Sequence, residues 1–577
     1  MTTLRAWRGG GGRRWMVAGL AILVFAWSFV YRYNDPEGNF AGLFDDHYFY
    51  LVRGWQMLFG DLPDRDFVDP GAPLTFALQA LVQVGLGRGV WSEFTFCVAA
   101  LSVASALTFV GACLVAGSIP IGLLAAFIQI TLHPRFYNYP KVLVYAAAIP
   151  LIWRFMDRPG LARRLSLAAA TAVALLLRHD HGAFVGLATM LAIALLPGLT
   201  PRAKVQQALS YAVLVVLMLS PYLAYLQVNG GVLTHVVTAN SWAQRDRARA
   251  PLVLPYFSSV PRPDDDPPQE EPDWWQDGIF VQATRNYEPW LFWLAVALPL
   301  LVTGTLALST TAFRPNWPHA RRKVVVLVVL GGVLVAGFLR GRLSSRFGDV
   351  SVTMALLLAV LVRAASSLMT KSSGDRTPLP LRAMVALVAM VAIGGTLFTV
   401  FPSVWNRLDL DAMTERPLGA YDRLHVITQR LQTWPLETWA KPDDDGPMLL
   451  AFYLRDCTAP DDRVFISQYL PQVAALSQRA FAGGHGDLRP SFFTTAADQK
   501  LTISRLEHQR VPVVVMPGGG EFEGFSKDFP RIDAYLQTRY RAVGDFDIGL
   551  DSPIRLFVSR AAKQTGEYAH HQWPCFR

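Results

Sequence analysis

The sequence predicts an all-α polytopic membrane protein that carries a C-terminal extracytoplasmic α/β domain, on three observations. The chain of 577 residues is 52% hydrophobic and only 17% charged, whereas soluble proteins carry about 25% charged residues. Its apolar residues gather in runs long enough to cross a hydrocarbon core of about 30 Å. After about residue 445 these runs give way to short alternating helix and strand patterns, which are typical of an α/β domain.

The apolar runs define the candidate membrane spans, and the arginine-rich connections orient them. The N-terminal run is too long for a signal peptide and is expected to be a first span with a cytoplasmic N-terminus. Basic connections at 154–164, 197–204, 313–323 and 371–382 are expected on the cytoplasmic side. This placement also explains the net charge of +9 without any nucleic-acid partner. The candidate spans are 15–33, 72–87, 94–115, 118–132, 141–155, 163–177, 182–197, 205–226, 289–309, 323–340, 348–368 and 382–402.

The loops 34–71 and 133–141 are both expected outside, so an even number of crossings must separate them. Three candidate spans lie between them, and we therefore expect one of 72–87, 94–115 or 118–132 to be incomplete. This leaves about eleven crossings. The protein is then a multi-pass cell-membrane protein, with an outer C-terminus. The predicted domains are a membrane domain at 1–402, a linker at 403–444 and an extracytoplasmic α/β domain at 445–577.

The C-terminal region and the long outer loop give further expectations. Helices are predicted at 448–457, 469–479 and 531–540, and strands at 463–467, 511–516 and 554–560. Because disulfides form outside the cytoplasm, Cys457 and Cys575 are a candidate pair, with two unpaired thiols as the alternative. The loop 227–288 ends in an acidic, proline-rich stretch that we expect to be irregular, and its length suits a lid over a site.

The stretch FDDHYFY at 44–50 places two adjacent carboxylates, Asp45 and Asp46, and His47 at the start of a predicted helix. We expect this helix to lie in the membrane interface, because its apolar residues recur at helical spacing. Helix capping explains one carboxylate. An adjacent pair can instead supply a general base, or bind a hard divalent cation such as Mg or Mn. The apolar stripe consists of Phe44, Tyr48, Leu51, Trp55 and Leu58.

The segment FDDHYFYLVRGWQMLFGDLPDRDFVDPGAPL, at 44–74, resembles the first outer loop of C-type (GT-C fold) glycosyltransferases that use polyprenyl-phosphate-linked sugars. This superfamily includes the protein O-mannosyltransferases and the lipid A aminoarabinose transferases. Its members carry an acidic pair after span one, and then a G..PYRDF.D..PP element that reads GDLPDRDFVDPGAPL in this chain. Asp64 stands where an aromatic residue is common and Ala72 where a second proline or a lysine is common, which leaves the subfamily open.

The resemblance implies an inverting sugar transferase with a polyprenyl-phosphate-sugar donor and a glycan, lipid or protein acceptor. It places the catalytic base at Asp45 or Asp46, and of the two we prefer Asp45, with Asp46 as its partner. A departing phosphate needs positive charge at the outer surface. Arginines at span ends also snorkel to headgroups without any catalytic role. The candidate substrate-binding residues are His47, Arg65, Asp66, Asp69, Arg135, Asn138, Lys141, Arg178, His179, Asp180, His181, Arg340, Arg342 and Arg346.

Two other classes of protein compete with this reading. A transporter or flippase of lipid-linked or small polar substrates would also use intramembrane ionisable residues. Its ionisable groups should lie near mid-membrane, whereas here they gather at one expected face, and no internal symmetry is visible. A non-catalytic envelope scaffold would leave the acidic pair unexplained. His179, Asp180 and His181 are consecutive, and three adjacent ligands rarely converge on one metal ion, so no metal site is expected there.

Overall fold

The computed structural model describes the chain in two compact units that are each considered alone. The helical unit comprises Met1–Pro36, Cys97–Pro221 and Arg249–Leu424, and the mixed unit comprises Glu37–Phe96, Tyr222–Ala248 and His425–Arg577. The described residues are 10–34, 46–132, 135–249, 254–257, 276–308, 319–338, 347–369, 378–408, 419–432, 446–486, 488–489, 491–550, 552–569 and 571–577.

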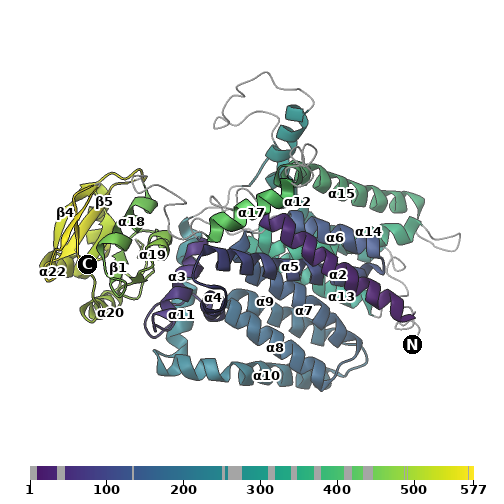
Figure 1. Ribbon diagram of the computed structural model, residues 1–577. Helices are drawn as coiled ribbons and strands as arrows, with labels where there is room; N and C mark the ends of the chain where they lie inside the picture. The colour runs from purple at the N-terminus through teal and green to yellow at the C-terminus, as the bar shows by residue number, and fades with distance from the viewer. Residues whose placement is uncertain are drawn as a thin grey trace. The chain divides into compact units, whose positions relative to one another are not determined.

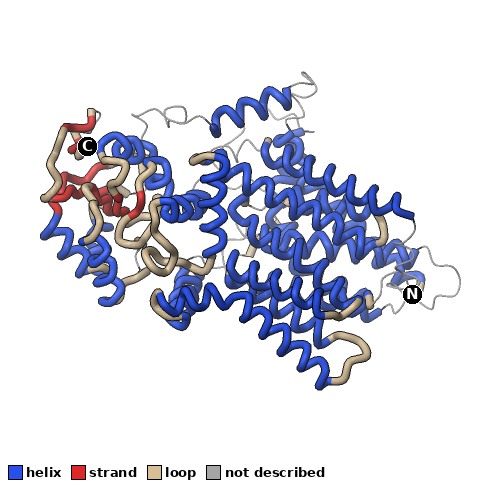
Figure 2. Tube along the Cα trace, turned by 60° about the horizontal axis from the view of Figure 1, so that its bottom comes forward, coloured by secondary structure: helices blue, strands red, loops and turns tan. Residues whose placement is uncertain are grey.

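The helical unit is a bundle in which most helices lie side by side (Figures 1 and 2). Its centre is α14, which packs against α6, α7, α12, α13 and α15 and buries nearly its whole length. Its helices are α2 (Gly10–Tyr33), most of α5 (Val90–Ala116), α6 (Ile119–Thr131), α7 (Tyr139–Asp157), α8 (Leu161–Leu177), α9 (His179–Ala194), most of α10 (Pro201–Val228), α12 (Gln276–Leu308), α13 (Ala320–Phe338), α14 (Phe347–Met369) and α15 (Leu379–Leu408), with a 3₁₀ turn η2 (Phe136–Asn138) before α7.

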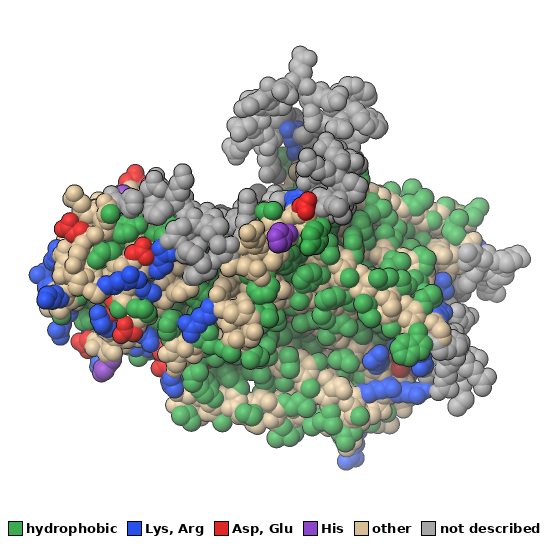
Figure 3. Space-filling model, in the orientation of Figure 1, with side chains coloured by type: hydrophobic (Ala, Val, Ile, Leu, Met, Phe, Trp, Pro, Cys, Tyr) green, Lys and Arg blue, Asp and Glu red, His purple; other side chains and the backbone are tan. Residues whose placement is uncertain are grey.

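Every predicted span falls on a helix of the structure. Among the described residues, six helices are long and apolar enough to cross a membrane: α2, α5, α10, α12, α14 and α15. Many apolar side chains of the helical unit point outward, such as Ile22 and Leu23 on α2, and hydrophobic side chains cover much of the face shown in Figure 3. A surface of this kind is stable against lipid and would be unfavourable in water.

The stretch with too many candidate spans contains two short helices. The run at 72–87 forms α4 (Pro73–Leu86) with 14 residues, and the run at 118–132 forms α6 with 13 residues. At about 1.5 Å per residue each helix is roughly 20 Å long, which is less than the bilayer core of about 30 Å. The run at 94–115 lies in α5, which has 27 residues. The number of crossings stays a prediction, under which helix length favours α4 or α6 as the incomplete one.

The mixed unit contains a five-stranded sheet of order β2-β1-β3-β5-β4. Strand β1 is parallel to β2 and β3, whereas β5 is antiparallel to β3 and β4. Its elements are α3 (Asp46–Leu58), α4, α11 (Val232–Arg249), α18 (Pro447–Cys457), β1 (Arg463–Ile466), α19 (Pro471–Ser477), β2 (Ala480–Phe481), α20 (Ala496–Glu507), β3 (Val513–Pro517), α21 (Gly520–Asp528), α22 (Pro530–Arg539), β4 (Tyr540–Phe546), β5 (Ile554–Ser559), β6 (Gly566–Tyr568) and β7 (Trp573–Cys575), and α17 (Gly419–Gln432) is divided between the units.

Two expectations about the outer loops need correction. The helix itself is present as α3, but the prediction that only one apolar stripe of it is covered is wrong. Helix α3 is buried on all sides from His47 to Gln56. It packs against α4 and α19, so protein covers the faces that we expected to meet headgroups and water. The predicted loop at 227–288 begins with an ordered helix, α11, and its acidic proline-rich stretch at 261–275 lies outside the described residues.

Candidate functional site

The second residue of the acidic pair, Asp46, is the first residue of α3. Asp45 lies outside the described residues. The dipole of a helix favours carboxylates at this end. The next residue, His47, places its Nδ1 atom 3.0 Å from Oε1 and 3.2 Å from Oε2 of Glu93, in the first turn of α5. Both side chains are buried. Glu93 was not among the predicted site residues, although a lone carboxylate in an apolar run signals a functional residue.

Helix α3 is held rigidly by polar contacts within the mixed unit. The indole N–H of Trp55 donates to Oε1 of Gln83 on α4 at 3.1 Å. The amide of Gln56 pairs with the backbone of Phe481 in β2, with both hydrogen bonds at 3.0 Å. Gly54 lets α3 approach α4 closely, because a Cβ atom there would lie 2.7 Å from Cβ of Gln79. Asp46 therefore begins a helix that is fixed by its contacts, as precise chemistry requires.

The carboxylates of the loop between α3 and α4 fix its backbone. Asp61 forms a bidentate ion pair with Arg463, at 2.6 and 3.0 Å. Asp66 accepts from the backbone N–H of Leu62 at 2.8 Å and pairs with Arg65, whose side chain is 47% exposed. These contacts give Asp66 a structural role. A role in substrate binding for Arg65 and Asp66 remains a proposal.

A second group consists of Asp64 and Asp69 of this loop together with His235 of α11. Asp64 adopts a positive φ of 62° and its Oδ1 atom lies 2.8 Å from Nδ1 of His235 on α11. Asp69 is buried and its Oδ1 atom accepts from the N–H groups of Gly71 and Ala72 at 2.7 and 2.8 Å. Its Oδ2 atom is buried and has no hydrogen-bond partner among the residues that the structure describes.

Electrostatics couple these three side chains. Burial, followed by the charge of Asp64, raises the pKa of Asp69 to about 6. Burial alone would lower the pKa of His235, but the hydrogen bond and the charge of Asp64 raise it above its ordinary value. Asp64 is one of the two departures from the family pattern. In this chain it joins the loop to α11.

The helical unit brings two predicted clusters, at 135–141 and 178–182, into one charged group. Nζ of Lys141, in the first turn of α7, lies 2.7 Å from Oδ1 of Asp349 in the first turn of α14. Both side chains are only 9% exposed. Nδ1 of His181 lies 2.5 Å from the hydroxyl of Tyr145. Arg178, at the α8–α9 junction, interacts electrostatically with Lys141 and Asp349.

Asp180 and Asp349 supply the negative charge of this group. Oδ1 of Asp180 lies 3.3 Å from Nε of Arg178, and its Oδ2 atom lies 3.7 Å from Nε2 of His181. Asp349 was missing from the predicted site residues, and its signal was a lone acid at the head of an apolar run. The group therefore joins the first turns of α7, α9 and α14 through paired charges.

The remaining predicted residues divide into three cases. Asn138 is buried in η2 and precedes Lys141 by less than one turn. The side chain of Arg135 is exposed and donates to the hydroxyl of Tyr137 at 3.2 Å, and His179 is half-buried at the start of α9. Arg340, Arg342 and Arg346 lie outside the described residues.

Within the part of the chain that the structure describes, no three His, Cys, Asp or Glu side chains come together as ligands for a metal ion. The described atoms include neither Asp45 nor the side chain of Asp46. The Mg or Mn role of the acidic pair therefore stays a prediction.

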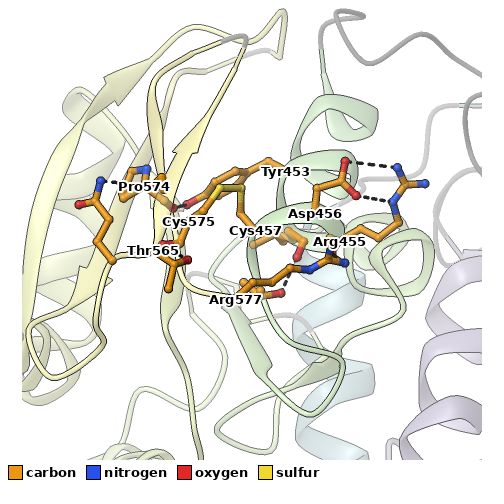
Figure 4. Close-up of a disulfide and its surroundings, with 12 residues drawn as sticks. Tyr453, Arg455, Asp456, Cys457, Thr565, Pro574, Cys575 and Arg577 are labelled. Carbon is orange, nitrogen blue, oxygen red and sulfur yellow. Dashed lines mark hydrogen bonds and ion pairs between the residues drawn. A yellow bond between two sulfur atoms is a disulfide. The ribbon is translucent and has the colours of Figure 1, made fainter.

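A disulfide joins Cys457 at the end of α18 to Cys575 in β7 (Figure 4). Backbone and side-chain hydrogen bonds support it. Tyr453 donates from its hydroxyl to the carbonyl of Pro574 at 2.8 Å, and the N–H of Phe576 donates to the carbonyl of Cys457 at 2.7 Å. The C-terminal segment is thus attached to α18 by the same pair that the sequence singled out.

No protein-family model matches this chain, and no curated protein is significantly similar to it in sequence. The structure defines a mostly helical protein with six apolar helices of membrane-spanning length among its described residues. The activity must therefore be argued from the chemistry of its clusters and from the resemblance of its first outer loop.

Proposed function

We propose that this protein is a membrane glycosyltransferase that transfers a sugar from a polyprenyl-phosphate donor to a glycan, lipid or protein acceptor on the outer face. The observation that carries the proposal is the acidic pair Asp45 and Asp46 in the sequence, of which Asp46 begins α3, a helix held by buried contacts. It stands in the segment that resembles the first outer loop of GT-C glycosyltransferases.

In the proposed reaction Asp45 or Asp46 acts as the general base. The carboxylate takes the proton of an acceptor hydroxyl, and the acceptor oxygen forms a bond to the anomeric carbon of the donor sugar. The bond from that carbon to the phosphate oxygen breaks, and polyprenyl phosphate leaves with the electron pair. Attack on the face opposite the leaving group inverts the anomeric centre. A base held on a rigid helix lowers the barrier through its fixed orientation.

The charged group of the helical unit supports the second half of this reaction. Lys141 is buried and the side chain of Arg178 is 29% exposed, and electrostatic stabilisation of a departing phosphate is stronger around such partly enclosed cations than in water. Asp349 keeps the charge of Lys141 compensated before the donor binds, and the donor phosphate would then compete for the same ammonium group. The Cys457–Cys575 disulfide fits an oxidising compartment, which agrees with an outer C-terminal region.

The test is a transfer assay with the full chain in proteoliposomes and a labelled polyprenyl-phosphate sugar. We expect the Asp45→Asn, Asp46→Asn double variant to lose at least about 100-fold in rate. A matched double variant, Asp422→Asn with Asp461→Asn, removes two exposed carboxylates elsewhere and should transfer normally. Full activity of the first double variant would contradict the proposed base.

A second candidate function is transport of a lipid-linked or small polar substrate. The buried Lys141–Asp349 pair favours it, because ionisable residues inside apolar helices are typical of coupled transport. Uptake of labelled substrate into sealed vesicles, without covalent transfer, would support this alternative over the transferase.

A further inference from the structure

A cluster of aromatic rings and guanidinium groups lies in the mixed unit, apart from the carboxylates described above. Its centre is Trp242 on α11. The Trp242 ring lies 4.9 Å from Phe492, 5.7 Å from Phe493 and 6.4 Å from Phe49 of α3, measured between ring centroids. Three segments that are far apart in the sequence therefore meet at one indole.

Arginine side chains stack on the same rings. The guanidinium carbon of Arg489 lies 4.3 Å from the ring centroid of Tyr469, 5.4 Å from that of Phe492 and 5.7 Å from that of Trp242. The corresponding distance from Arg245 to Phe492 is 5.7 Å. Guanidinium planes favour such stacking and carry several hydrogen-bond donors in a rigid fork.

The cluster is anchored in the core at one end and half-exposed at the other. Phe492 and Phe493 are 2% and 9% exposed and belong to the hydrophobic core of the sheet. By contrast, the side chains of Trp242, Tyr469 and Arg489 are half-buried. These three side chains, together with Arg245, are called the aromatic–arginine surface. Large rigid rings that stay partly open to solvent are the usual anchors of binding surfaces.

The backbone beneath this surface is strained. Ser491 and Phe493 have positive φ values of 69° and 56°. A bulky residue such as phenylalanine rarely adopts this region. Strained backbone of this kind gathers at functional sites.

The position of Tyr469 in the sheet supports a binding role. It follows the carboxyl end of β1, which is flanked by its parallel neighbours β2 and β3. From β1 the chain continues to β2 on one side of it, and β3 then lies on the other side of β1, so the strand order reverses at β1. In sheets of parallel strands, ligands bind beyond the carboxyl ends at the point where the strand order reverses.

The surface also begins one helical turn from the start of α3. Phe49 contacts Trp242, and it lies three residues after Asp46 on α3. Residues three apart occupy the same face of a helix, one turn from each other. A ligand on the aromatic–arginine surface would therefore lie within reach of the first turn of α3.

We propose that the aromatic–arginine surface binds an oligosaccharide, which is the glycan part of the acceptor. The C–H faces of sugar rings pack on Trp242 and Tyr469, and the guanidiniums of Arg489 and Arg245 donate hydrogen bonds to hydroxyl or carboxylate oxygens. A few fixed polar groups among aromatic rings are typical of small-molecule and saccharide sites. That this oligosaccharide belongs to the acceptor rests on the proposed transferase function, but its binding can be measured without any sugar transfer.

The experiment uses the full chain in lipid nanodiscs on an array of neutral and uronate-bearing oligosaccharides, without donor lipid. Dissociation constants are then measured for the sugars that bind. We expect Trp242→Ala, Tyr469→Ala and Arg489→Gln each to weaken binding about tenfold or more. Matched controls are Tyr535→Ala, a half-buried tyrosine on α22, and Arg555→Gln, whose guanidinium carbon lies 4.3 Å from the ring centroid of Phe522. Both controls should bind normally, and thermal unfolding shows that each variant is folded.

The outcomes separate this proposal from the transferase function. Absence of binding to every sugar on the array, or binding that is unchanged in all three surface variants, overturns the oligosaccharide surface. Binding that depends on the surface supports it even if no sugar transfer is found, in which case only the transferase function fails. Transfer that proceeds normally in the three surface variants would remove this surface as the acceptor site while leaving the transferase intact.

Discussion

The Nδ1 atom of His47 lies 3.0 Å from Oε1 of Glu93, and the two side chains are only 3% and 1% exposed. This contact joins the first turn of α3 to the first turn of α5. Because His47 directly follows Asp46, its contact with Glu93 also fixes the first turn of α3, which Asp46 begins. A buried pair of this kind is costly to break from one side only.

We therefore predict that Glu93→Ala lowers the free energy of unfolding by about 3 kcal/mol or more, because it leaves His47 buried without its carboxylate partner. Glu93→Gln keeps the shape and one acceptor oxygen, so it should fold. It should still lower kcat for sugar transfer about tenfold with little change in KM, since misplaced catalytic groups lose rate rather than affinity. Thermal unfolding and steady-state kinetics measure the two effects.

A double-mutant cycle provides the control for this pair. If His47 and Glu93 act together, the unfolding free energies of His47→Ala and Glu93→Ala will not add in the double variant. Additive losses would show that the contact carries no coupling and that each residue acts alone.

The Lys141–Asp349 pair gives a prediction that separates stability from function. Asp349→Leu should destabilise the helical unit by about 3–5 kcal/mol, because it leaves the Lys141 ammonium buried beside a leucine. The double variant Lys141→Met, Asp349→Leu replaces the pair with apolar groups and should recover most of that loss. Transfer activity should stay low in the double variant, since the cation that we propose to bind the donor phosphate is gone. A double variant with normal transfer would exclude Lys141 from phosphate binding.

The pH dependence of stability should report on Asp69 and His235. The folded chain raises the pKa of Asp69 to about 6 from 3.8, so it holds a proton that the unfolded chain has released. Stability therefore falls as pH rises through this window. The raised pKa of His235 acts in the same direction, because its contribution is complete below its ordinary pKa of 6.5 and is lost as pH rises above it.

Unfolding temperatures measured from about pH 4 to about pH 8 check this dependence. Asp69→Asn keeps an oxygen for the N–H groups of Gly71 and Ala72, and it should flatten the lower part of the profile. His235→Asn should flatten the upper part. A wild-type profile that rises with pH across both windows would contradict the assignment.

Local patterns predicted some of the regular elements of the C-terminal region, whereas helices α20 and α21 were not predicted. The helices α18, α19 and α22 and the strands β1, β3 and β5 lie where the sequence predicted them, because each carries a continuous apolar run or a helical period. Strand β2 has two residues and β4 is largely exposed, so neither shows a pattern of burial that a sequence reveals. Burial of α3 was missed because α19, which covers it, comes from a distant part of the chain.

Site residues could likewise be predicted where a local charged segment marks them, but not where their partner lies far along the chain. The charged segments at 135–141 and 178–182 are conspicuous in an apolar sequence, and the structure brings Lys141 and Arg178 together. Glu93 and Asp349 are single acids whose partners lie far along the chain. Nothing local marks such a residue as the other half of a pair, so only the three-dimensional structure could assign its role.

The Cys457–Cys575 disulfide closes a loop of 118 residues that contains the whole five-stranded sheet. A crosslink over about 100 residues stabilises a fold by about 4–5 kcal/mol, mainly by restricting the unfolded chain. We predict that dithiothreitol lowers the unfolding temperature of the mixed unit and has no such effect on the Cys457→Ser, Cys575→Ser variant. The matched control is Cys97→Ala with Cys113→Ala, which removes two buried cysteines of α5 that are not part of this disulfide and should leave the response to reductant unchanged. Alkylation of Cys457 and Cys575 in the folded, unreduced protein would contradict the crosslink, because a disulfide leaves no thiol to react.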